Sequence, residues 1–337
     1  MSNFFKQALF PVLLVLCSSV TAQAAPAVQI GYMPIIADSQ AFVIAEGLTQ
    51  QNPLKDAKLV EFQNGPEIVQ ALISGQLDVA YVGAGPAMVA RAHGADVRFL
   101  AGNEHGATRL LALGNLAPYF KGTNGTGAGA ADALARFAQD KGRKPVITTF
   151  PIGSVPAAAL HYWLRNQIHA SPDAIQAVYQ GENQVVQALL TGAVDGAAVL
   201  DPAVDIVMAR RPDARIVVED QQLFPGQPGA GLLVRESLMK KDPQYVRELV
   251  AAHIQATRLL REHPQQAAVA VQKYLGGGRL STAIVLQSMK NVVYDADPHR
   301  MEQDTKTLYD FQSQIGILKK PLVVHDLFDT QIYDQMK

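Results

Sequence analysis

Short apolar runs alternate with amphipathic stretches along the first third of the chain. An apolar run of about five residues bounded by turn formers is typical of a buried strand, whereas apolar residues spaced three or four apart indicate a helix. Strands are predicted at 28–32, 58–62, 78–82, 97–101 and 108–113, with helices beginning after Ser39, Pro66 and Pro86. This alternation favours a domain built on a parallel sheet.

The same alternation returns after a stretch rich in Gly, Thr and Asn at 117–129, which we interpret as a crossing into a second domain. Further strands are predicted at 145–150, 174–179, 196–200 and 215–218, and helices at 155–167, 183–191 and 202–210. A returning strand is predicted at 232–234, followed by a mostly helical remainder that includes 243–262 and 265–274. This remainder is expected to pack back on the first domain.

An internal repeat relates the two halves. Residues 68–80, IVQALISGQLDVA, recur as VVQALLTGAVDGA at 185–197, with seven of 13 positions identical at an offset of 117. Each copy predicts a helix that ends at a Gly, a turn containing an Asp, and an apolar strand. Because solenoid repeats are only about 20–50 residues long, this offset indicates two related α/β domains. Chance similarity between two amphipathic helices is the alternative.

The N-terminus has the features of a secretory signal peptide. Lys6 precedes an apolar run at 8–16, and small residues follow up to Ala24, the expected cleavage site. Cys17, the single cysteine, lies inside this segment, with Leu16 where a lipoprotein signal needs a small residue. Cleavage therefore leaves a chain without thiolate nucleophiles, disulfides or cysteine metal ligands. No later stretch holds 18 uninterrupted apolar residues, so we expect a soluble periplasmic protein.

The length and net charge of the chain limit the classes of partner that it can bind. The 337 residues suggest two domains at roughly 100–200 residues each, and 48% hydrophobic residues suit a globular core. The 29 basic and 30 acidic residues give a net charge of -1, with no basic run. Nucleic acid is therefore not an expected partner, because binding to phosphates needs clustered positive charge.

Four predicted strand ends carry turn residues that begin a helix. They lie at 34–39, 63–66, 83–86 and 151–154. Ligands of open parallel sheets bind at this edge, and free backbone N–H groups at helix starts can hold an anion without Arg. Ordinary helix capping is the alternative at each junction.

Acidic residues lie at the same predicted edge, whereas the junctions hold no Lys or Arg. They are Asp38, Glu104, Glu182 and Asp201. A zwitterionic solute would satisfy both features, with its acidic group on helix starts and its amine near a carboxylate. Alternatively, Asp38 caps a helix, and Glu104 and Asp201 pair with surface bases.

Signals for catalysis are weak. His105 has no second His at metal-binding spacing, and Ser154 lacks the final Gly of a Gly-x-Ser-x-Gly elbow. The segment 125–130 breaks the dinucleotide pattern and is interpreted as a flexible loop. We therefore expect no catalytic residue, no metal and no cofactor.

These junctions resemble periplasmic solute-binding proteins of the nitrate/sulfonate/taurine ABC-transporter family, whose relatives include thiamine-pyrimidine binders. The matching residues are Gly31 to Pro34 with Asp38-Ser39, Gly65-Pro66-Glu67 with Ala71-Leu72 and Gly75-x-x-Asp78, Gly83 to Pro86, Gly153-Ser154, and Gly192-x-x-Asp195 with Asp201-Pro202. The chain departs from the family in a longer Gly-rich segment at 121–144 and in the residues 147–150 before Gly153-Ser154.

The resemblance implies an α/β, type II periplasmic-binding fold of two lobes with a ligand cleft. The expected division is a signal peptide at 1–24, lobe one at 25–114 and 222–337, and lobe two at 115–221, with hinges near Gly114 and 222–229. The expected ligand contacts are Asp38, Ser39, Gln40, Asn64, Gly83, Ala84, Gly85, Glu104, His105, Gly153, Ser154, Val155, Glu182 and Asp201.

The resemblance also implies a monomer that captures a small anionic or zwitterionic solute and delivers it to an ABC permease and its ATPase. The protein would meet the membrane only through the permease. Two alternatives stay open: a thiamine-pyrimidine-related binder or enzyme on the same fold, and a ligand-sensing subunit of a membrane receptor. The enzyme family is associated with a cysteine-rich motif, which the mature chain lacks.

Overall fold

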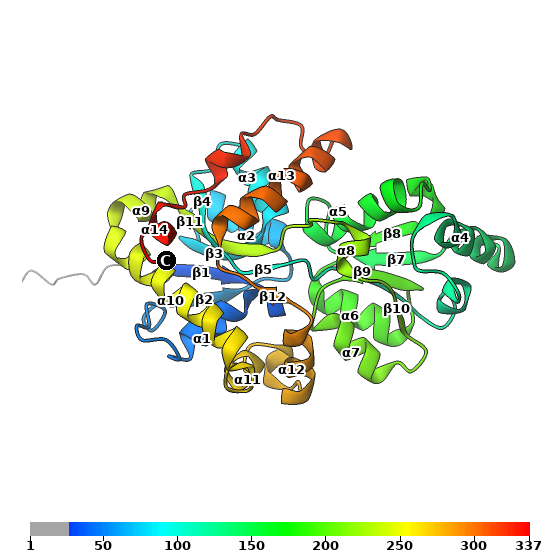
Figure 1. The fold of residues 1–337 in the computed structure, drawn as a ribbon, viewed down its shortest axis with the longest axis horizontal. Coiled ribbons are helices and arrows are strands. Elements are labelled where there is room, and N and C mark those ends of the chain that lie inside the picture. Colours follow the sequence, from blue (N-terminus) through cyan, green and yellow to red (C-terminus); the bar gives the residue numbers. More distant parts are fainter. Residues whose placement is uncertain (1–26) are drawn as a thin grey trace, which may run out of the picture.

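A computed structural model describes residues 27–337 and shows two α/β lobes side by side (Figure 1). The predicted signal peptide, with Cys17, lies outside the described residues. Each lobe is built around its own five-stranded sheet. The two-lobed α/β architecture predicted from the sequence is confirmed. Within residues 27–337, no helix is both long and apolar enough to cross a bilayer.

The sheet of lobe one has the strand order β2-β1-β3-β11-β4. Its strands are β1 (Gln29–Tyr32), β2 (Lys58–Glu61), β3 (Val79–Gly83), β4 (Val97–Gly102) and β11 (Ala230–Arg235). β1, β2 and β3 pair in parallel, but β11 runs antiparallel to both β3 and β4. The predicted all-parallel sheet is therefore wrong, because the returning strand inserts inside the sheet rather than at its edge.

Helices cover both faces of this sheet, so its strands read as continuous apolar runs. Successive β3 residues point to opposite faces: Tyr81 joins one core cluster, and Ala80 and Val82 join the other. One face is covered by α1 (Ser39–Ala45), α10 (Pro243–Glu262) and α11 (Pro264–Gln272), and the other by α2 (Gly65–Ile73), α3 (Ala84–Ala92) and α13 (Pro298–Gln314).

The sheet of lobe two has the order β8-β7-β9-β6-β10 and repeats the topology of lobe one. Its strands are β6 (Arg109–Ala112), β7 (Val146–Thr149), β8 (Gln176–Tyr179), β9 (Gly196–Val199) and β10 (Arg215–Val218). Its helices are α4 (Gly127–Lys141), α5 (Val155–Tyr162) with a π-helical turn (Trp163–Gln167), α6 (Glu182–Thr191), α7 (Ala203–Arg210) and α8 (Asp220–Leu223). In each sheet a crossing strand, β11 or β6, lies antiparallel beside the third strand.

The internal repeat corresponds to a shared structural unit. Gly75 and Gly192 end equivalent helices, with φ of 76° and 70°, a left-handed conformation that glycine adopts without strain. The following Asp makes the same contacts in both lobes. Asp78 accepts a hydrogen bond from the Gln29 amide at 2.9 Å, and Asp195 accepts one from the Val146 amide at 2.8 Å. Both Asp residues therefore tie the helix–strand unit to the neighbouring parallel strand, β1 in lobe one and β7 in lobe two.

Substitution of Asp195 is expected to destabilise lobe two. Its carboxylate is buried, yet hydrogen bonds from Arg143 at 2.6 and 2.8 Å and from Val146 outweigh the effect of burial and lower its pKa. We expect Asp195→Ala to reduce the free energy of unfolding by about 2–3 kcal/mol, because three hydrogen bonds to a charged group are lost. Urea denaturation measures this. The exposed Asp132→Ala is the control, and equal stability of the two variants would contradict the assignment.

The chain crosses between the lobes earlier than predicted. The strand expected at 108–113 exists as β6, but it pairs with β9 and β10 in lobe two. The crossing therefore lies at Gly106 and Ala107, whose φ angles are 74° and 84°. The predicted hinge residue Gly114 lies beyond it, inside lobe two, where its amide donates to Asp213 at 3.2 Å. Local periodicity located the strand but carried no information on its pairing partners.

The Gly-rich segment at 117–129 is not the crossing, and the loop expected at 125–130 runs into a helix. A 3-10 turn (Ala117–Phe120) comes first, and α4 begins at Gly127. Gly125, with φ of 76°, packs so closely on Val217 that a Cβ would lie 1.9 Å from its carbonyl oxygen. The Trp163 indole donates to the Gly125 carbonyl at 2.7 Å. Gly125 therefore serves tight packing rather than flexibility.

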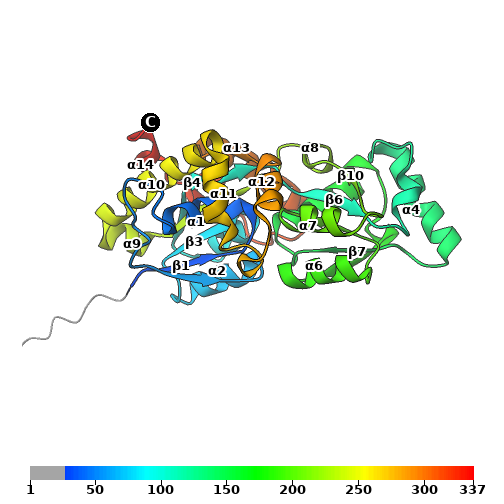
Figure 2. The same ribbon diagram turned by 90° about the horizontal axis from the view of Figure 1, so that it is seen from below.

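The C-terminal third contacts both lobes, not only the first (Figure 2). It contains α9 (Glu236–Lys241), α12 (Thr282–Lys290), β12 (Val293–Tyr294) and α14 (Gln331–Asp334) besides α10, α11 and α13. α12 lies against α7, where Ser288 donates to Asp205 at 2.8 Å. α13 lies against α5, where the Phe311 and Tyr162 rings meet at 5.1 Å. The lobes are therefore held together on two sides.

Candidate functional site

A small cavity of about 40 Å³ lies between the lobes. It is lined by Met33, Ile35, Ala37, Gly65, Gly83, Pro86, Gly106, Phe150, Ser154, Val155, Pro156, Leu200, Pro228, Gly229 and Ala230. Residues from both lobes and both crossings contribute. A single water needs about 10–15 Å³ of such space, so the enclosed volume suits only a few atoms. The lobes are therefore close together around this cavity.

The structure brings all four predicted junctions to the cavity, with Ile35 and Ala37 representing the junction at 34–39. α2, α3 and α5 begin there, and Gly65, Gly83 and Val155 all line the wall. Gly85 of lobe one approaches Gly153 of lobe two so closely that a Cβ on Gly85 would lie 2.2 Å from the Gly153 oxygen. Two predicted groups of ligand residues, 83–85 and 153–155, thus meet across the interface.

Two predicted polar residues cap their own helices. The Asn64 side chain accepts a hydrogen bond from the Glu67 amide at 3.0 Å, and the Ser154 hydroxyl accepts one from the Ala157 amide at 3.3 Å. Capping satisfies one orphan N–H of each helix. The capping interpretation therefore holds at these side chains, although Ser154 also lines the cavity.

All four predicted acidic residues are buried beside the cavity or the adjoining interface. Asp38 accepts a hydrogen bond from the Met33 amide at 2.8 Å, and Glu104 accepts bonds from the Ala230 amide at 3.2 and 3.0 Å. Met33 and Ala230 line the cavity, so both carboxyls bind residues of its wall, although none of the four acidic residues is itself among the lining residues. On the opposite side, the Asp201 carbonyl accepts from the Ile36 amide at 3.0 Å, a bond between lobes.

Burial raises the pKa of every one of these carboxyls. It raises the pKa of Glu104 to about 8 and that of Glu182 to about 8, with the Asp201 charge adding to the second. Burial also raises the pKa of Asp201 to about 7, although Arg109 beside it acts in the opposite direction. The pKa of Asp38 is raised by burial and by Glu104. The cluster is therefore shielded from solvent and contains more acidic than basic side chains.

Three residues of this cluster were missed by the sequence analysis. Arg109 forms a buried ion pair with Asp201, and Asn291 donates to the same carboxylate at 3.2 Å. The Tyr294 hydroxyl donates to Ser39 Oγ at 3.3 Å and is close enough to Glu104 and Asp201 for their charges to raise its pKa. A basic residue in the apolar run of β6 was the one available signal, because a buried Arg needs a carboxylate partner.

Two predicted contacts point to other partners. Gln40 lies inside lobe one, where its amide donates to the Asn103 carbonyl at 2.7 Å and to Thr257 at 3.2 Å. His105 lies on β5 (Glu104–His105) between Asp295 at 2.9 Å and Asp304 at 3.0 Å. Burial lowers the pKa of His105, but these two hydrogen bonds outweigh it and raise the value to about 9. His105 is therefore a cation that connects the crossing to Asp295 and Asp304.

Comparison with known proteins identifies the family. The model of the NMT1-like family matches residues 21–275. The chain belongs to the NMT1-like family. No curated protein matched in a separate search.

Solved structures similar to this NMT1-like protein share its fold. One is the ligand-binding component of an ABC-type import system from Staphylococcus aureus, with 17% identity, a TM-score of 0.75 and coverage of 92% of this chain and 99% of that one. The alkanesulfonate-binding protein SsuA from Xanthomonas axonopodis pv. citri is 20% identical, with a TM-score of 0.69 and coverage of 91% of this chain and 100% of that one. The periplasmic nitrate-binding protein NrtA from Synechocystis PCC 6803 is 14% identical, with a TM-score of 0.76 and coverage of 92% of this chain and 88% of that one.

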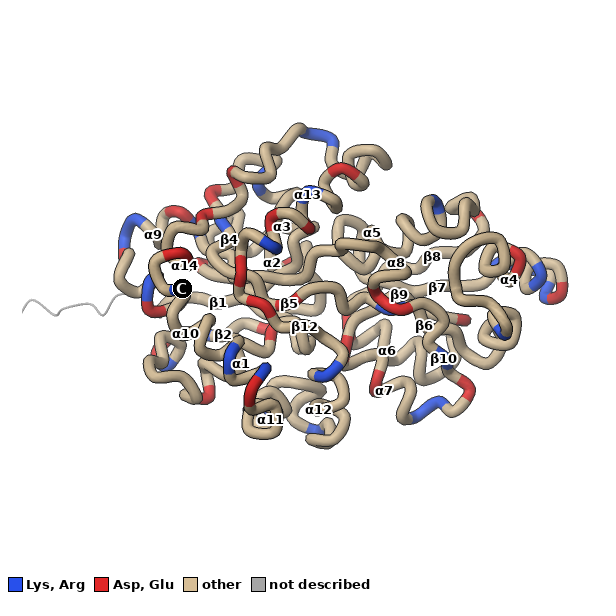
Figure 3. The backbone as a smooth tube through the Cα atoms, in the orientation of Figure 1, with Lys and Arg blue, Asp and Glu red and all other residues tan. Residues whose placement is uncertain are grey.

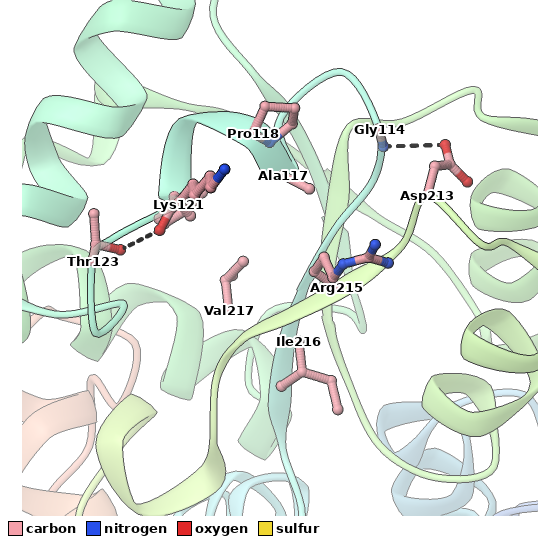
Figure 4. A pocket seen from close by; sticks show the side chains of 10 residues that line it. Gly114, Ala117, Pro118, Lys121, Thr123, Asp213, Arg215, Ile216 and Val217 are labelled. Carbon is pink, nitrogen blue, oxygen red and sulfur yellow. Dashed lines mark hydrogen bonds between the residues drawn. The ribbon is translucent and has the colours of Figure 1, made fainter.

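A larger cavity, about 670 Å³, lies elsewhere, on lobe two (Figure 4). It is bordered by the 3-10 turn that contains Pro118 and by β10, with Lys121 and Arg215 among its lining residues. None of the predicted ligand residues lines it. Within residues 27–337, no group of three or more His, Asp or Glu side chains is arranged to hold a metal ion. The interlobe cavity is therefore the candidate ligand site.

Proposed function

We propose that this protein is an extracytoplasmic solute-binding protein that captures a small anionic or zwitterionic solute and delivers it to an ABC permease and its ATPase. The observation that carries the proposal is the meeting of three helix starts and two chain crossings around one interlobe cavity. Solved proteins of this fold include a sulfonate binder, a nitrate binder and a component of an ABC-type import system. The predicted secretion signal supports a periplasmic location.

Binding is coupled to closure of the lobes. The two crossings lie side by side, since His105 and Pro228 form a β-bridge, and they can act as one hinge between rigid sheets. A solute that contacts both walls binds the closed form more tightly than the open form and shifts the population toward it. The closed monomer would then dock on the permease. No step of this cycle needs a catalytic group.

An enzyme on the same fold is less well supported. The two side chains that were weighed as catalytic candidates have structural partners: Ser154 caps α5, and His105 is held between two carboxylates. A receptor subunit that presents the closed form to a membrane sensor uses the same binding step. Genes for a permease and ATPase beside the coding sequence would favour uptake, and a sensor kinase would favour signalling.

Calorimetric titration tests the function directly. Purified mature protein is titrated with taurine, alkanesulfonates, nitrate and hydroxymethylpyrimidine, and each mixture is assayed for solute conversion. We expect saturable binding of at least one sulfonate or amino-sulfonate solute at a stoichiometry of one, with no conversion. Turnover of any solute would replace the binding function with an enzymatic one, and failure of every solute to bind would contradict the proposed solute class.

A further inference from the structure

The start of α6 in lobe two is completed by a residue of lobe one. The Glu182 amide donates to the Gln63 carbonyl oxygen at 3.0 Å, and the Asn183 amide donates to Gln63 Oε1 at 3.2 Å. Gln63 lies between β2 and α2, so both bonds cross from one lobe to the other. The first N–H groups of a helix have no partner inside the helix, and here lobe one supplies two of them with acceptors.

The repeat shows how α6 differs from its counterpart α2. At the offset of 117, Asn64 and Pro66 correspond to Gly181 and Asn183. Asn64 caps α2 itself, by accepting from the Glu67 amide at 3.0 Å, and Pro66 has no N–H group that needs a partner. In α6 a glycine replaces the capping side chain, and Asn183 carries an N–H group where α2 has none. The two replacements leave α6 with backbone donors that lobe one satisfies.

Gly181 permits the close approach of lobe one. Its φ of -76° and ψ of 166° are extended angles that any residue adopts, so the backbone conformation does not require glycine. A Cβ on Gly181 would, however, lie 2.9 Å from Gln63 Cβ and 3.4 Å from the Gln63 carbonyl oxygen. The Gln63 side chain is oriented from its own lobe, because its amide donates to Glu61 at 3.4 Å. The missing side chain at position 181 is therefore what lets Gln63 reach the amides of α6.

Opposite charges do not draw these two segments together. Residues 62–67 and 180–184 contain one acid each, Glu67 and Glu182, and no Lys or Arg (Figure 3). Backbone hydrogen bonds and close fit make the contact instead. Both bonds join different lobes, so they exist only while the lobes are together, and in an open form the same amides would face water. Closure exchanges water for protein acceptors, a net gain for the closed form.

We infer that Gln63 and the start of α6, residues 181–183, form an interlobe latch that favours the closed form and populates it before a solute binds. This inference rests on the proposed function and deepens it, because the latch acts on the closure that captures the solute. Gln63 does not line the interlobe cavity, so it is a positioning residue that acts on the lobes rather than on the solute. The affinity for any solute held between the lobes rises with the stability of the closed form.

The distance between the lobes tests the latch without any solute. The mature chain, residues 25–337, contains no cysteine, so Gln70→Cys on α2 and Gln187→Cys on α6 can each carry one spin label. Both positions are exposed and correspond in the repeat. Pulsed electron double resonance then gives the ratio of closed to open molecules, and we expect the solute-free protein to populate the closed form. Gln63→Ala should lower this ratio by about threefold or more, the equivalent of one hydrogen bond. Gln184→Ala is the matched control and should leave the ratio unchanged, because Gln184 accepts from the Gly181 amide, at 3.4 Å, within lobe two.

Gly181→Asn separates the latch from a purely structural role. It gives α6 the capping residue that α2 has, and it places a side chain where Gln63 approaches. We expect the ratio of closed to open molecules to fall by about tenfold or more, because the close approach is blocked. The melting temperature should stay within about 2 °C of the wild type, since asparagine caps a helix at least as well as glycine. Thr126→Asn, at the N-cap of α4 and away from the other lobe, is the control and should change neither quantity (Figure 1).

The outcomes distinguish the latch from the proposed function. A solute-free wild type that is entirely open would overturn the inference. So would a closed-to-open ratio in Gln63→Ala and Gly181→Asn equal to that of their controls, whatever happens to the melting temperature. Neither result affects the proposed function, which calorimetric titration tests separately. If no solute binds, the proposed function fails, and the distances measured without solute still decide whether the latch exists.

Discussion

Gly85→Ala is expected to hold the two lobes apart and to weaken solute binding by about 100-fold or more. The new Cβ would lie 2.2 Å from the Gly153 carbonyl oxygen, far inside van der Waals contact, and this oxygen belongs to the opposite lobe. Gln312, whose side-chain amide donates to the same oxygen at 3.4 Å, leaves no simple route for Gly153 to move. The closed form is therefore penalised, while the open form is unaffected.

The fold of lobe one should tolerate this substitution. Gly85 lies in the first turn of α3, and alanine favours a helix over glycine by about 1 kcal/mol. Small-angle scattering should show a larger radius of gyration than for the wild type, and calorimetry should show the loss of affinity. Gly129→Ala in the first turn of α4 is the control, because its Cβ would meet nothing closer than 3.5 Å. Wild-type scattering and affinity for Gly85→Ala would show that closure does not bring these residues together.

Local patterns predicted most elements of this fold well. The helix α10 and the strand β10 have the predicted bounds, 243–262 and 215–218. The repeat predicted two related lobes, and the equivalent contacts of Asp78 and Asp195 explain why that acid recurs. Strand and helix periods are local properties, so a single sequence is enough to detect them.

The pairing of the strands could not be predicted from the sequence as well as their positions could. β6 has the apolar pattern of any buried strand, and nothing in residues 109–112 distinguishes a place in lobe one from one in lobe two. The sequence did not predict α4, because Gly127 and Gly129 are typical of a loop. The helix is stabilised by Ala133, Leu134 and Phe137, which pack into the core of lobe two. Both errors concern long-range packing, which overrides local propensity.

The candidate site shows the same limit. Strand ends predicted the positions of Asp38, Glu104 and Asp201, because the carboxyl edge of a sheet follows from strand direction. Their partners Arg109, Asn291 and Tyr294 come from distant segments without a recognisable motif. These partners decide what each acid contacts. The burial of the acids therefore became visible only in three dimensions.

Ligand-free protein is expected to lose stability as the pH rises from about 5 to about 9. In the folded state the pKa of Glu104 and that of Glu182 are raised from 4.5 to about 8, so the folded protein binds more protons than the unfolded chain within this window. Stability therefore falls as the pH rises from near 4.5 through 8. His105 acts in the same direction: its stabilisation is present below the unfolded pKa of 6.5 and is lost as the pH rises through 9.

At lower pH the direction reverses. The pKa of Asp195 is held below its usual value by hydrogen bonds from Arg143 and Val146, which outweigh burial, and hydrogen bonding to His105 lowers that of Asp295. Their stabilisation is present above the unfolded pKa and is lost as the pH falls through the folded values. Maximum stability is therefore expected near pH 5.

Urea denaturation at pH 5, 6.5, 8 and 9 measures this profile. We expect the free energy of unfolding to fall by about 3 kcal/mol or more between pH 5 and 9, since one pKa unit corresponds to about 1.4 kcal/mol. The double variant Glu104→Gln, Glu182→Gln should make the fall between pH 5 and 8 shallower, with the remainder due to Asp38, Asp201 and His105. The exposed Glu262→Gln should leave the profile unchanged. A flat wild-type profile would mean that these carboxyls gain protein partners or solvent as they ionise.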